Sequence, residues 1–522
     1  MIAKGKVLTG HYFDSVSLML AARDLRAMPG IADAALVMAT AENKTILRSS
    51  GMELSEFTQA GDADLLIVVK GESEELAKSA LDTALSSLNK KRSKTNTTEN
   101  TSKSLLGALK NNPDTNLVLI SVAGKFAAHE ARAALENNMH VMLFSNNVSI
   151  EYEVDLKTFA HEKGLLMMGP DCGTAIINGI PLAFANLVRR GKIGIVAASG
   201  TGLQEVASII HSAGGGISQA IGTGGRDVKN KVGGITFLDA FEALKNDPET
   251  NVVVLVSKPP ESVILEKLAA AVKGITKPVV TIFLGADKSV SRKMGAYAAQ
   301  TLEESAYMAV ALSKKIEMNE IAPNAKVRTE LFRSIVHDKA YRMAKTQKWL
   351  RGIFSGGTFA HEALMISSRS LGIVRTNITN DAQQKLTDSW LSCEHTIVDL
   401  GEDEFTVGRP HPMIDYSLRR KRIAQEAADP ETACILLDVV LGFGSHEDPL
   451  SELIPEIREA QRNAQAAKRY IAFVASVTGT ELDPQNRTRV VEGLENIGVF
   501  VLPSNAAAAE CATMIVSARG VN

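Results

Sequence analysis

The feature that most constrains this chain is an internal repeat in its second half. The segment Ser199-Gly-Thr-Gly-Leu-Gln-Glu205 matches Gly356-Gly-Thr-Phe-Ala-His-Glu362, with Gly-Thr in common and a glutamate four residues after the threonine. Further along, Asp247-Pro-Glu-Thr and the apolar run after it recur as Asp429-Pro-Glu-Thr and a second apolar run. Self-similarity of this kind predicts duplicated structural units.

A third landmark follows in the same order. Lys277-Pro-Val-Val-Thr-Ile-Phe-Leu-Gly is echoed by Arg469-Tyr-Ile-Ala-Phe-Val-Ala-Ser-Val-Thr-Gly. Three landmarks in one order predict two homologous domains of flavodoxin-like α/β type, over residues 191–312 and 350–522.

Short apolar segments alternate with helical ones through most of the chain. After residue 104 these segments are 117–122, 141–144, 165–168 and 193–197. Continuous apolar strands of this length are buried on both faces, which is typical of parallel doubly wound sheets. The fold class expected is therefore α/β.

The rest of the chain divides by composition. Residues 1–89 predict a small α/β module, and residues 90–104 are polar without an apolar period, which predicts a flexible linker. A further α/β domain is expected over residues 105–190. The charged segment 313–349 is expected to be a helical connector.

Composition excludes several classes of partner. The formal net charge of −2 gives no general attraction to nucleic acid or to anionic lipid. The longest apolar runs are far shorter than the roughly 20 residues of a membrane-spanning helix. The four cysteines are scattered, without CxxC or other metal-ligand spacing, so we expect no metal and a reducing, cytoplasmic location.

Each repeat places a turn of small residues between a strand and a helix. The first backbone N–H groups of a helix lack intrahelical partners, and the helix dipole adds positive potential there. Such a turn binds a phosphate or carboxylate, although it also occurs as a plain N-cap. The candidate anion-binding residues are Ser199, Gly200, Thr201, Gly202, Ser355, Gly356, Gly357 and Thr358.

Cationic residues follow other predicted strands. Lys258 comes after the buried run Val252–Val256, at the strand edge where α/β sites form. Arg226 follows Gly224 and Gly225, and its planar fork suits a carboxylate or phosphate. The alternatives are a solvated lysine at a strand end and an arginine within a structural loop network.

A proline-rich loop supplies two more candidates. Arg409 and His411 lie in Gly408-Arg-Pro-His-Pro, where two prolines restrict the backbone. We assign Arg409 to substrate binding and His411 to catalysis, beside Lys258 and Arg226. His361, one turn into the second small-residue helix, is either a surface histidine or a functional one.

Three carboxylates have bland explanations. Glu205 and Glu362 lie early in the two repeated helices, where acidic residues favour the helix dipole. Asp438 ends a predicted strand and is expected to cap a turn.

The motifs resemble those of a known family. Residues 114–174, with Gly169-Pro-Asp-Cys-Gly-Thr174, look like the second half of the CoA-binding domain of the succinyl-CoA synthetase α subunit. Residues 193–205 and 222–227 resemble the next domain of that subunit. Residues 352–474 resemble the carboxy-terminal domain of its β subunit.

The whole arrangement resembles the FdrA family. The motifs are Ile120-Ser-Val-Ala-Gly124, Gly169–Thr174, Gly408-Arg-Pro-His-Pro-Met-Ile-Asp415 and the fused β-subunit-like domain. The resemblance implies that residues 105–190 form a Rossmann-like domain of CoA-binding type. It also implies CoA-type loops at Val122, Ala123, Ser145, Asn146, Asp171, Cys172 and Gly173.

Departures from the synthetase bear on mechanism. In that family the two helix starts face each other across a phosphorylated histidine, but here Met294-Gly295-Ala296-Tyr297 lacks it. The acidic residue that steadies that histidine corresponds to Lys258. The pocket is thus more cationic, which suits direct binding of an anionic substrate instead of a phosphoryl relay.

Other parts of the synthetase are missing. The chain has no ATP-grasp domain, so no ATP site is expected. The glycine-rich turn that opens the CoA domain appears as Thr9-Gly-His-Tyr-Phe-Asp-Ser15, with bulky residues where a backbone cradle is needed. CoA stays as a possible ligand, and no cofactor is certain.

Three functions follow from the resemblance. The first is a subunit of an oxamate carbamoyltransferase of allantoin breakdown, which uses carbamoyl phosphate and partner subunits. The second is an acyl-CoA synthetase whose ATP-grasp portion is a separate subunit. The third is a non-catalytic metabolite-binding scaffold. Each takes a small anion such as an acyl phosphate or a carboxylate, and a homo-oligomer is compatible with all three.

Overall fold

The chain folds into two compact units. The computed structural model describes residues 1–518 except 12, 14, 27, 50, 96–101, 103, 324 and 407–409. One unit comprises residues 1–114 with 402–415, and the other comprises residues 115–401 with 416–522. Each is described separately below.

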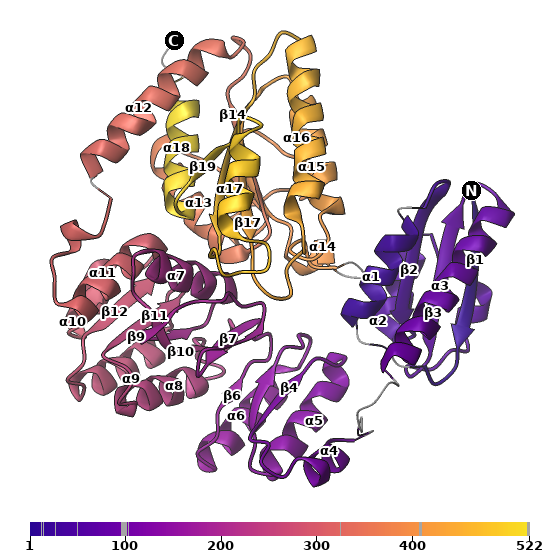
Figure 1. Ribbon diagram of the computed structural model, residues 1–522, viewed down its shortest axis with the longest axis horizontal. Helices are drawn as coiled ribbons and strands as arrows, with labels where there is room; N and C mark the ends of the chain where they lie inside the picture. Colours follow the sequence, from indigo (N-terminus) through magenta and orange to yellow (C-terminus); the bar gives the residue numbers. More distant parts are fainter. Residues whose placement is uncertain are drawn as a thin grey trace. The chain divides into compact units, whose positions relative to one another are not determined.

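The N-terminal unit is a three-stranded antiparallel sheet packed on helices. Its strands are β1 (Ile2–Leu8), β2 (Ile31–Met38) and β3 (Leu65–Gly71), in the order β1-β3-β2 (Figure 1). Its helices are α1 (Ser15–Arg26), α2 (Ala41–Ser49), α3 (Glu74–Thr95), α4 (Leu105–Asn111) and α14 (Asp403–Thr406). The apolar faces of the sheet and of α1 and α3 form one core, which includes Leu36, Ile67 and Ala80.

The expected linker is shorter than its composition indicates. Helix α3 continues to Thr95, because Lys90–Lys94 is rich in lysine and arginine, which are good helix formers. Residues 96–101 and 103 of the expected linker lie outside the described residues. Helix α4 groups with the N-terminal unit, although residues 105–190 were expected to form the next domain.

The larger unit begins with a small parallel sheet. Strands β4 (Leu117–Ile120), β5 (His140–Leu143) and β6 (Met167–Met168) alternate with α5 (Gly124–Glu136) and α6 (Ile150–Glu162). The hairpin β7 (Thr174–Ile177) and β8 (Ile180–Ala183) belongs instead to the next sheet, where β7 pairs with β10. Its two-residue turn is feasible because Asn178 and Gly179 both have positive φ.

The first repeat forms a seven-stranded sheet. Its parallel strands are β9 (Arg190–Ala197), β10 (Ile217–Gly222), β11 (Val252–Ser257), β12 (Val279–Phe283) and β13 (Tyr297–Ala298), in the order β13-β12-β11-β9-β10-β7-β8. Its helices are α7 (Gly200–Ser212), α8 (Ile235–Asn246), α9 (Ser262–Lys273), α10 (Lys288–Lys293) and α11 (Leu302–Lys314).

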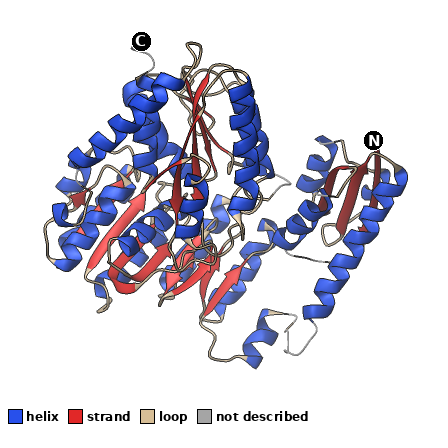
Figure 2. Cartoon of the chain, turned by 45° about the horizontal axis from the view of Figure 1, so that its top comes forward, coloured by secondary structure: helices blue, strands red, loops and turns tan. Residues whose placement is uncertain are grey.

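The second repeat forms a six-stranded parallel sheet. Its strands are β14 (Trp349–Phe354), β15 (Arg375–Thr376), β16 (Thr396–Asp399), β17 (Thr432–Val440), β18 (Ala472–Thr478) and β19 (Phe500–Leu502), in the order β15-β16-β14-β17-β18-β19. Its helices are α13 (Gly357–Leu371), α15 (Ser417–Ala428), α16 (Pro449–Ala466), α17 (Arg487–Glu495) and α18 (Asn505–Ser517). Figure 2 shows helices on both sides of the strands.

The two repeats share one strand order. Counted from the first parallel strand of each repeat, both sheets follow the flavodoxin-like order 2-1-3-4-5, with β15 and β16 together in second place. The α/β fold expected from the alternating apolar segments is confirmed. In this order ligands bind where the strand order reverses, outside the carboxyl ends of the first and third strands.

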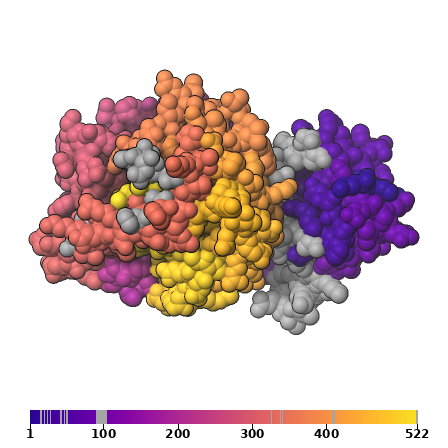
Figure 3. Space-filling view, turned by 90° about the horizontal axis from the view of Figure 1, so that it is seen from above, coloured from indigo at the N-terminus to yellow at the C-terminus, as the bar shows by residue number. Residues whose placement is uncertain are grey.

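A helical connector joins the repeats. Helix α12 (Ala325–Arg342) packs against α18, and both lie on the face seen in Figure 3. Arg328 of α12 donates to Glu303 at 2.5 Å and to Glu510 at 3.0 Å. Because Glu303 belongs to the first repeat and Glu510 to the second, this arginine holds the two together.

Two equivalent glutamates cap helices of the opposite repeat. Glu205 of α7 accepts the N–H of Asn505, the first residue of α18, at 2.8 Å. Glu362 of α13 accepts the N–H of Leu302, the first residue of α11, at 2.8 Å. The expectation that these glutamates serve their own helices is wrong, since each neutralises an unpaired N–H at a helix start across the domain interface.

Asn505 completes this reciprocal contact. Its side-chain amide donates to Glu362 at 2.8 Å, while its backbone N–H donates to Glu205. Both glutamates are buried, so an unpaired donor here would be costly. The interface therefore fixes the relative orientation of α7 and α13.

Burial makes one of these carboxyls titrate near neutrality. It raises the pKa of Glu362 to about 7, against its ordinary value of 4.5, while the hydrogen bonds from Asn505 and Leu302 act in the opposite direction. The folded chain therefore binds more protons at Glu362 than the unfolded chain between these two values. The stability gained in this way is complete below the unfolded pKa and is lost as pH rises through the folded pKa.

We predict that Glu362→Gln removes this pH dependence. The free energy of unfolding of the wild type, minus that of Glu362→Gln, should fall between about pH 4.5 and about pH 7. The slope should be at most roughly 1.4 kcal/mol per pH unit, the value for one proton. Urea unfolding at several pH values measures it, with exposed Glu266→Gln on α9 as the control. Parallel curves for wild type and Glu362→Gln would contradict the assignment.

Candidate anion site at two helix starts

The first repeat presents its small-residue turn at the amino end of α7. Ser199 is the N-cap, and its hydroxyl accepts the N–H of Gly202 at 3.0 Å. Gly200 and Thr201 are the first two helical residues, whose N–H groups have no carbonyl to bond within the helix. The α7 start thus combines a fixed hydroxyl with backbone donors.

The second repeat presents the equivalent turn at the amino end of α13. Gly356 is the N-cap and supplies no side-chain bond, so the N–H groups of Gly357, Thr358 and Phe359 all lack an intrahelical partner. Glycine at this position leaves the helix start uncapped by its own chain.

A buried ion pair supports the second turn from behind. Asp438 of β17 accepts both the N–H of Ser355 at 3.0 Å and its hydroxyl at 2.8 Å. Arg419 of α15 donates to Asp438 at 3.0 Å, and all three side chains are buried. Asp438 thus lies inside β17 and caps the turn after β14, whereas the sequence predicts it at the end of its own strand. Ser355, expected to bind the anion, instead holds the backbone, because its hydroxyl and N–H are both bonded to Asp438.

The two helix starts meet. The hydroxyls of Ser199 and Thr358 are 2.6 Å apart and share a hydrogen bond. A Cβ added to Gly356 would lie 2.7 Å from Cγ2 and 3.0 Å from Oγ1 of Thr201. These contacts bring Ser199, Thr201, Gly356 and Thr358 into one cluster. Two positive helix ends so close together strongly favour a negative charge between them.

Other strand ends surround the α7 start. A Cβ added to Gly200 would lie 3.2 Å from the hydroxyl oxygen of Thr174, and one added to Gly225 would lie 3.8 Å from the carbonyl oxygen of Ala198. Gly225 is exposed and follows β10. Gly224 has a positive φ of 84°, and a Cβ there would lie 2.3 Å from the carbonyl oxygen of Pro170. This loop can only be built with glycine at position 224.

Arg226 is held by the neighbouring Rossmann-like domain. It pairs with the buried Glu153 of α6 at 2.8 Å and donates to the carbonyl oxygen of Val148 at 2.9 Å. The adjacent Asp227 bonds to the buried Lys157 of α6 at 2.7 Å. Arg226 therefore belongs to a structural loop network, which was the alternative to ligand binding. Its bonds hold the Gly224–Asp227 loop against α6.

Lys258 lies at the carboxyl end of β11, one of the strands flanking the point where the order reverses. Its side chain is exposed. Its charge lowers the pKa of His361 on α13 of the second repeat. Lys258 therefore supplies a cation at the carboxyl edge of the seven-stranded sheet.

The CoA-type loops gather at the carboxyl edge of the three-stranded sheet. The hydroxyl of Ser145 donates to the carbonyl oxygen of Val122 at 2.5 Å, and the N–H of Asp171 donates to that of Ser145 at 3.0 Å. A Cβ at Gly124, next to Ala123, would lie 2.4 Å from the carbonyl oxygen of Asn146. The three loops expected from the resemblance thus meet at one edge.

Cys172 within these loops is a packing residue. It is buried under the turn after β10, where a Cβ on Gly222 would lie 2.7 Å from its sulfur. Burial raises the pKa of its thiol to about 12. The thiolate form needed for nucleophilic attack is therefore not populated near neutral pH. The adjacent Gly173 has no side chain and so contributes only backbone to the loop.

His411 and Arg409 are not part of the larger unit as the structure describes it. His411 lies in the segment 402–415, which groups with the N-terminal unit, and its Nδ1 accepts the N–H of Met413 at 3.3 Å. Arg409 lies outside the described residues. Both stay predictions from sequence.

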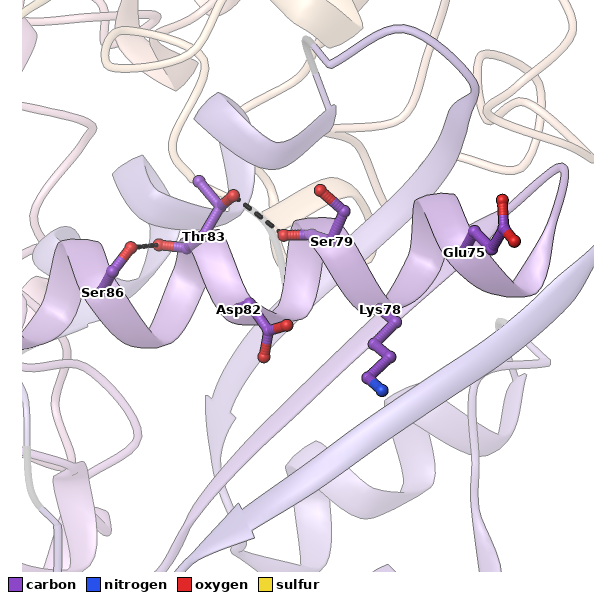
Figure 4. Close-up of a pocket in the computed structure, with 6 residues that line it drawn as sticks. All are labelled: Glu75, Lys78, Ser79, Asp82, Thr83 and Ser86. Atoms are coloured by element: carbon purple, nitrogen blue, oxygen red, sulfur yellow. Dashed lines mark hydrogen bonds between the residues drawn. The ribbon is translucent and has the colours of Figure 1, made fainter.

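The hollow along α3 does not mark a further site. A shallow hollow runs along α3 and is lined by Glu75, Lys78, Ser79, Asp82, Thr83 and Ser86 (Figure 4). These residues share one face of a single helix, and the hydroxyls of Thr83 and Ser86 donate to helix carbonyls at 2.9 Å. The hollow is therefore an open helix face whose polar groups do not converge.

Three family profiles match the chain. The profile "CoA-ligase" matches residues 353–515, and "CoA binding domain" matches residues 188–285. The second match covers the first repeat, downstream of residues 105–190 that were expected to be of CoA-binding type. The profile "AllF, heavy metal-associated domain" matches residues 1–104.

Curated relatives agree with these matches. YahF of Escherichia coli (strain K12) is 44% identical over 505 residues, which cover 97% of each chain. The succinate–CoA ligase α subunit of Methanothermobacter thermautotrophicus is 28% identical over 185 residues, and the malate–CoA ligase α subunit of Methylorubrum extorquens is 30% identical over 146 residues. The chain covers 61% and 47% of those two proteins.

The fold and the profiles define a protein with the acyl-CoA ligase-like domains of the succinyl-CoA synthetase superfamily. The 44% identity to YahF over nearly the full length of both chains shows that this chain belongs to the FdrA family.

The residues of the N-terminal unit do not fit a soft-metal site. Residues 1–104 contain no cysteine and one histidine, His11, whereas heavy-metal sites of this kind use thiolates. Across the described part of the chain, no group of three or more His, Cys, Asp or Glu side chains could hold a metal ion. None of the helices described is both long and apolar enough to cross a bilayer.

We predict that Gly356→Ala forces the helix starts apart. The added methyl group would meet Thr201 at 2.7 Å, so the interface must shift, at a cost of about 1–3 kcal/mol of unfolding free energy. Urea unfolding measures this cost. Thr201→Ala in the same chain should restore most of the loss, because it removes the two closest atoms. Equal destabilisation with and without Thr201→Ala would contradict the contact.

Proposed function

We propose that this chain is the anion-handling subunit of an acyl-phosphate-dependent transferase, with carbamoyl phosphate as donor and oxamate as acceptor. The observation that carries the proposal is the meeting of the α7 and α13 helix starts, where the hydroxyls of Ser199 and Thr358 share a hydrogen bond. Backbone N–H groups from both helices can bond to one phosphate, with the hydroxyls adding donors. Separate partner subunits would complete the enzyme.

The chemistry needs no phosphorylated side chain in this subunit. Carbamoyl phosphate is already activated, so the protein has to stabilise the oxyanion of the tetrahedral intermediate and the departing phosphate. Ala296 stands where the synthetase motif has its histidine, and it is buried. The exposed Lys258 adds a positive charge that a leaving phosphate would use.

The remaining predicted residues take supporting roles in this proposal. Gly200, Thr201, Gly357 and Thr358 would contact the phosphate through their N–H or hydroxyl groups, whereas Gly202 holds the Ser199 cap through its N–H. Gly224 and Gly225 leave space beside the α7 start. Arg226, bonded to Glu153, positions that loop.

A second candidate is favoured by the CoA-type profiles. An acyl-CoA synthetase with an ATP-grasp domain on another polypeptide would use the same anion site for an acyl phosphate. CoA would then be held by the loops at Val122, Ser145 and Asp171, which meet at one sheet edge. Two of the relatives named above are the α subunits of a succinate–CoA ligase and a malate–CoA ligase. The absence of histidine at position 296 counts against a phosphoryl relay.

Turnover assays separate the two candidates. The full chain, with its partner subunits, is mixed with carbamoyl phosphate and oxamate, or with ATP, CoA and a carboxylate. Release of phosphate with carbamoylated oxamate supports the first candidate, and ATP-dependent thioester formation supports the second. Binding of phosphate without turnover in either mixture would favour a metabolite-binding scaffold.

We predict that Lys258→Ala weakens binding of carbamoyl phosphate by roughly 1.5–3 kcal/mol, the value for a lost charge-assisted hydrogen bond. Titration calorimetry measures the affinity. Lys273→Ala, an exposed lysine on α9, is the matched control and should bind as the wild type does. Unchanged affinity in Lys258→Ala would remove Lys258 from the site.

We also predict that incubation with labelled ATP leaves no acid-labile phosphate on this chain. Position 296 has no imidazole to accept a phosphoryl group. Acid-labile label recovered on a histidine peptide would overturn the preference for a transferase over a ligase.

A further inference from the structure

His361 of the second repeat lies against the first repeat. It follows Thr358 by three residues, one turn of α13, so both side chains lie on the same face of the helix. Thr358 bonds to Ser199 of the first repeat at 2.6 Å. A Cβ added to Gly285, after β12, would lie 3.8 Å from Nε2 of His361. The imidazole therefore lies over the carboxyl edge of the seven-stranded sheet, one turn from the meeting helix starts.

Among the described residues, one charged group has a resolved effect on the pKa of His361. This group is Lys258, after β11, and the loop after β12 presents backbone through Leu284 and Gly285. The adjacent Glu362 faces the opposite way, toward Leu302 and Asn505. His361 is half-buried. Burial and the charge of Lys258 both disfavour the protonated form of its ring.

We propose that His361 is the general base of the transfer reaction: it takes the proton that the amide nitrogen of the attacking substrate loses. This inference rests on the proposed function. Neither repeat motif nor the family resemblance pairs a histidine on α13 with a lysine after β11. Helix α13 of the second repeat packs against α7 of the first, and His361 on it lies beside Gly285 after β12. Lys258 binds the anion, and His361 takes the proton.

The step balances in atoms and charge. The amide nitrogen of the acceptor attacks the carbamoyl carbon, and a C–N bond forms while the bond from that carbon to the phosphate oxygen breaks. The nitrogen gives one proton to His361, which passes it to the departing phosphate. No oxidant or further reactant is consumed.

The protonation state of the free imidazole agrees with this role. Burial lowers the pKa of His361, and the charge of Lys258 lowers it further, while a hydrogen bond with the backbone of Leu284 acts in the opposite direction. A neutral imidazole is the form that can accept a proton. An arriving phosphate dianion would stabilise the imidazolium formed during transfer.

His361→Gln in the full chain with its partner subunits tests the proposal. Glutamine keeps a polar side chain but has no basic nitrogen, so kcat for carbamoyl transfer should fall about 10²–10⁴-fold, the usual contribution of a general base. The affinity for inorganic phosphate, measured by calorimetry, should change less than about threefold. A kcat within about threefold of the wild type would overturn the proposal.

The pH profile separates catalysis from a structural role. The wild-type profile of kcat/KM should lose activity on its acid side as His361 becomes protonated. Lys258→Met removes the neighbouring positive charge and should move that acid limb to higher pH, whereas His361→Gln should abolish it. A limb that does not move in Lys258→Met would contradict the pairing.

A readout independent of turnover distinguishes failure of this inference from failure of the proposed function. The pKa of His361 in the wild type is followed by NMR, with assignment from His361→Gln or, if that variant does not fold, from His361→Asn. Inorganic phosphate should raise this pKa by at least about half a unit. If the wild type transfers no carbamoyl group, the proposed function fails. The placement of His361 at the anion site then stands or falls by that phosphate-induced change, and an unchanged pKa would overturn it.

Discussion

The structure depends on the reciprocal capping of helices across the two repeats. Glu205 and Glu362 occupy equivalent positions, and each accepts an otherwise unpaired N–H at a helix start in the opposite repeat. Because both are buried, the domains cannot rotate without exposing or orphaning these donors. That constraint brings the starts of α7 and α13 together, so that Ser199 and Thr358 are 2.6 Å apart. The meeting of the helix starts, where we propose the anion site, is a consequence of how the duplicated domains pair.

Duplication also explains the composition of the site. In each flavodoxin-like sheet the strand order reverses beside the first strand, and the helices that follow these two strands, α7 and α13, meet at their starts. The copies have diverged there: Asp438 and Arg419 support the second turn, while the first repeat places Lys258 at the edge. Helix α13 of the second repeat brings His361 to the carboxyl edge of the seven-stranded sheet, beside Gly285.

Much of this could be predicted from the sequence. The repeat and the apolar segments predicted two parallel α/β sheets, and the small-residue turns predicted helix starts. The cross-domain partners could not be predicted, because Glu205–Asn505 and Glu362–Leu302 join residues far apart in sequence. Ser355 and Arg226 were expected to bind the substrate. Their side chains instead bond to buried carboxylates, Asp438 and Glu153 respectively. Nothing local in their motifs reveals Asp438 or Glu153.

The most direct measurement is a crystal structure of the full chain soaked with inorganic phosphate. The account predicts one anion that accepts hydrogen bonds of about 2.7–3.2 Å from N–H groups of both α7 and α13. Phosphate bound to one helix alone, or no phosphate at these helix starts, would contradict the claim that the two repeats share a single anion.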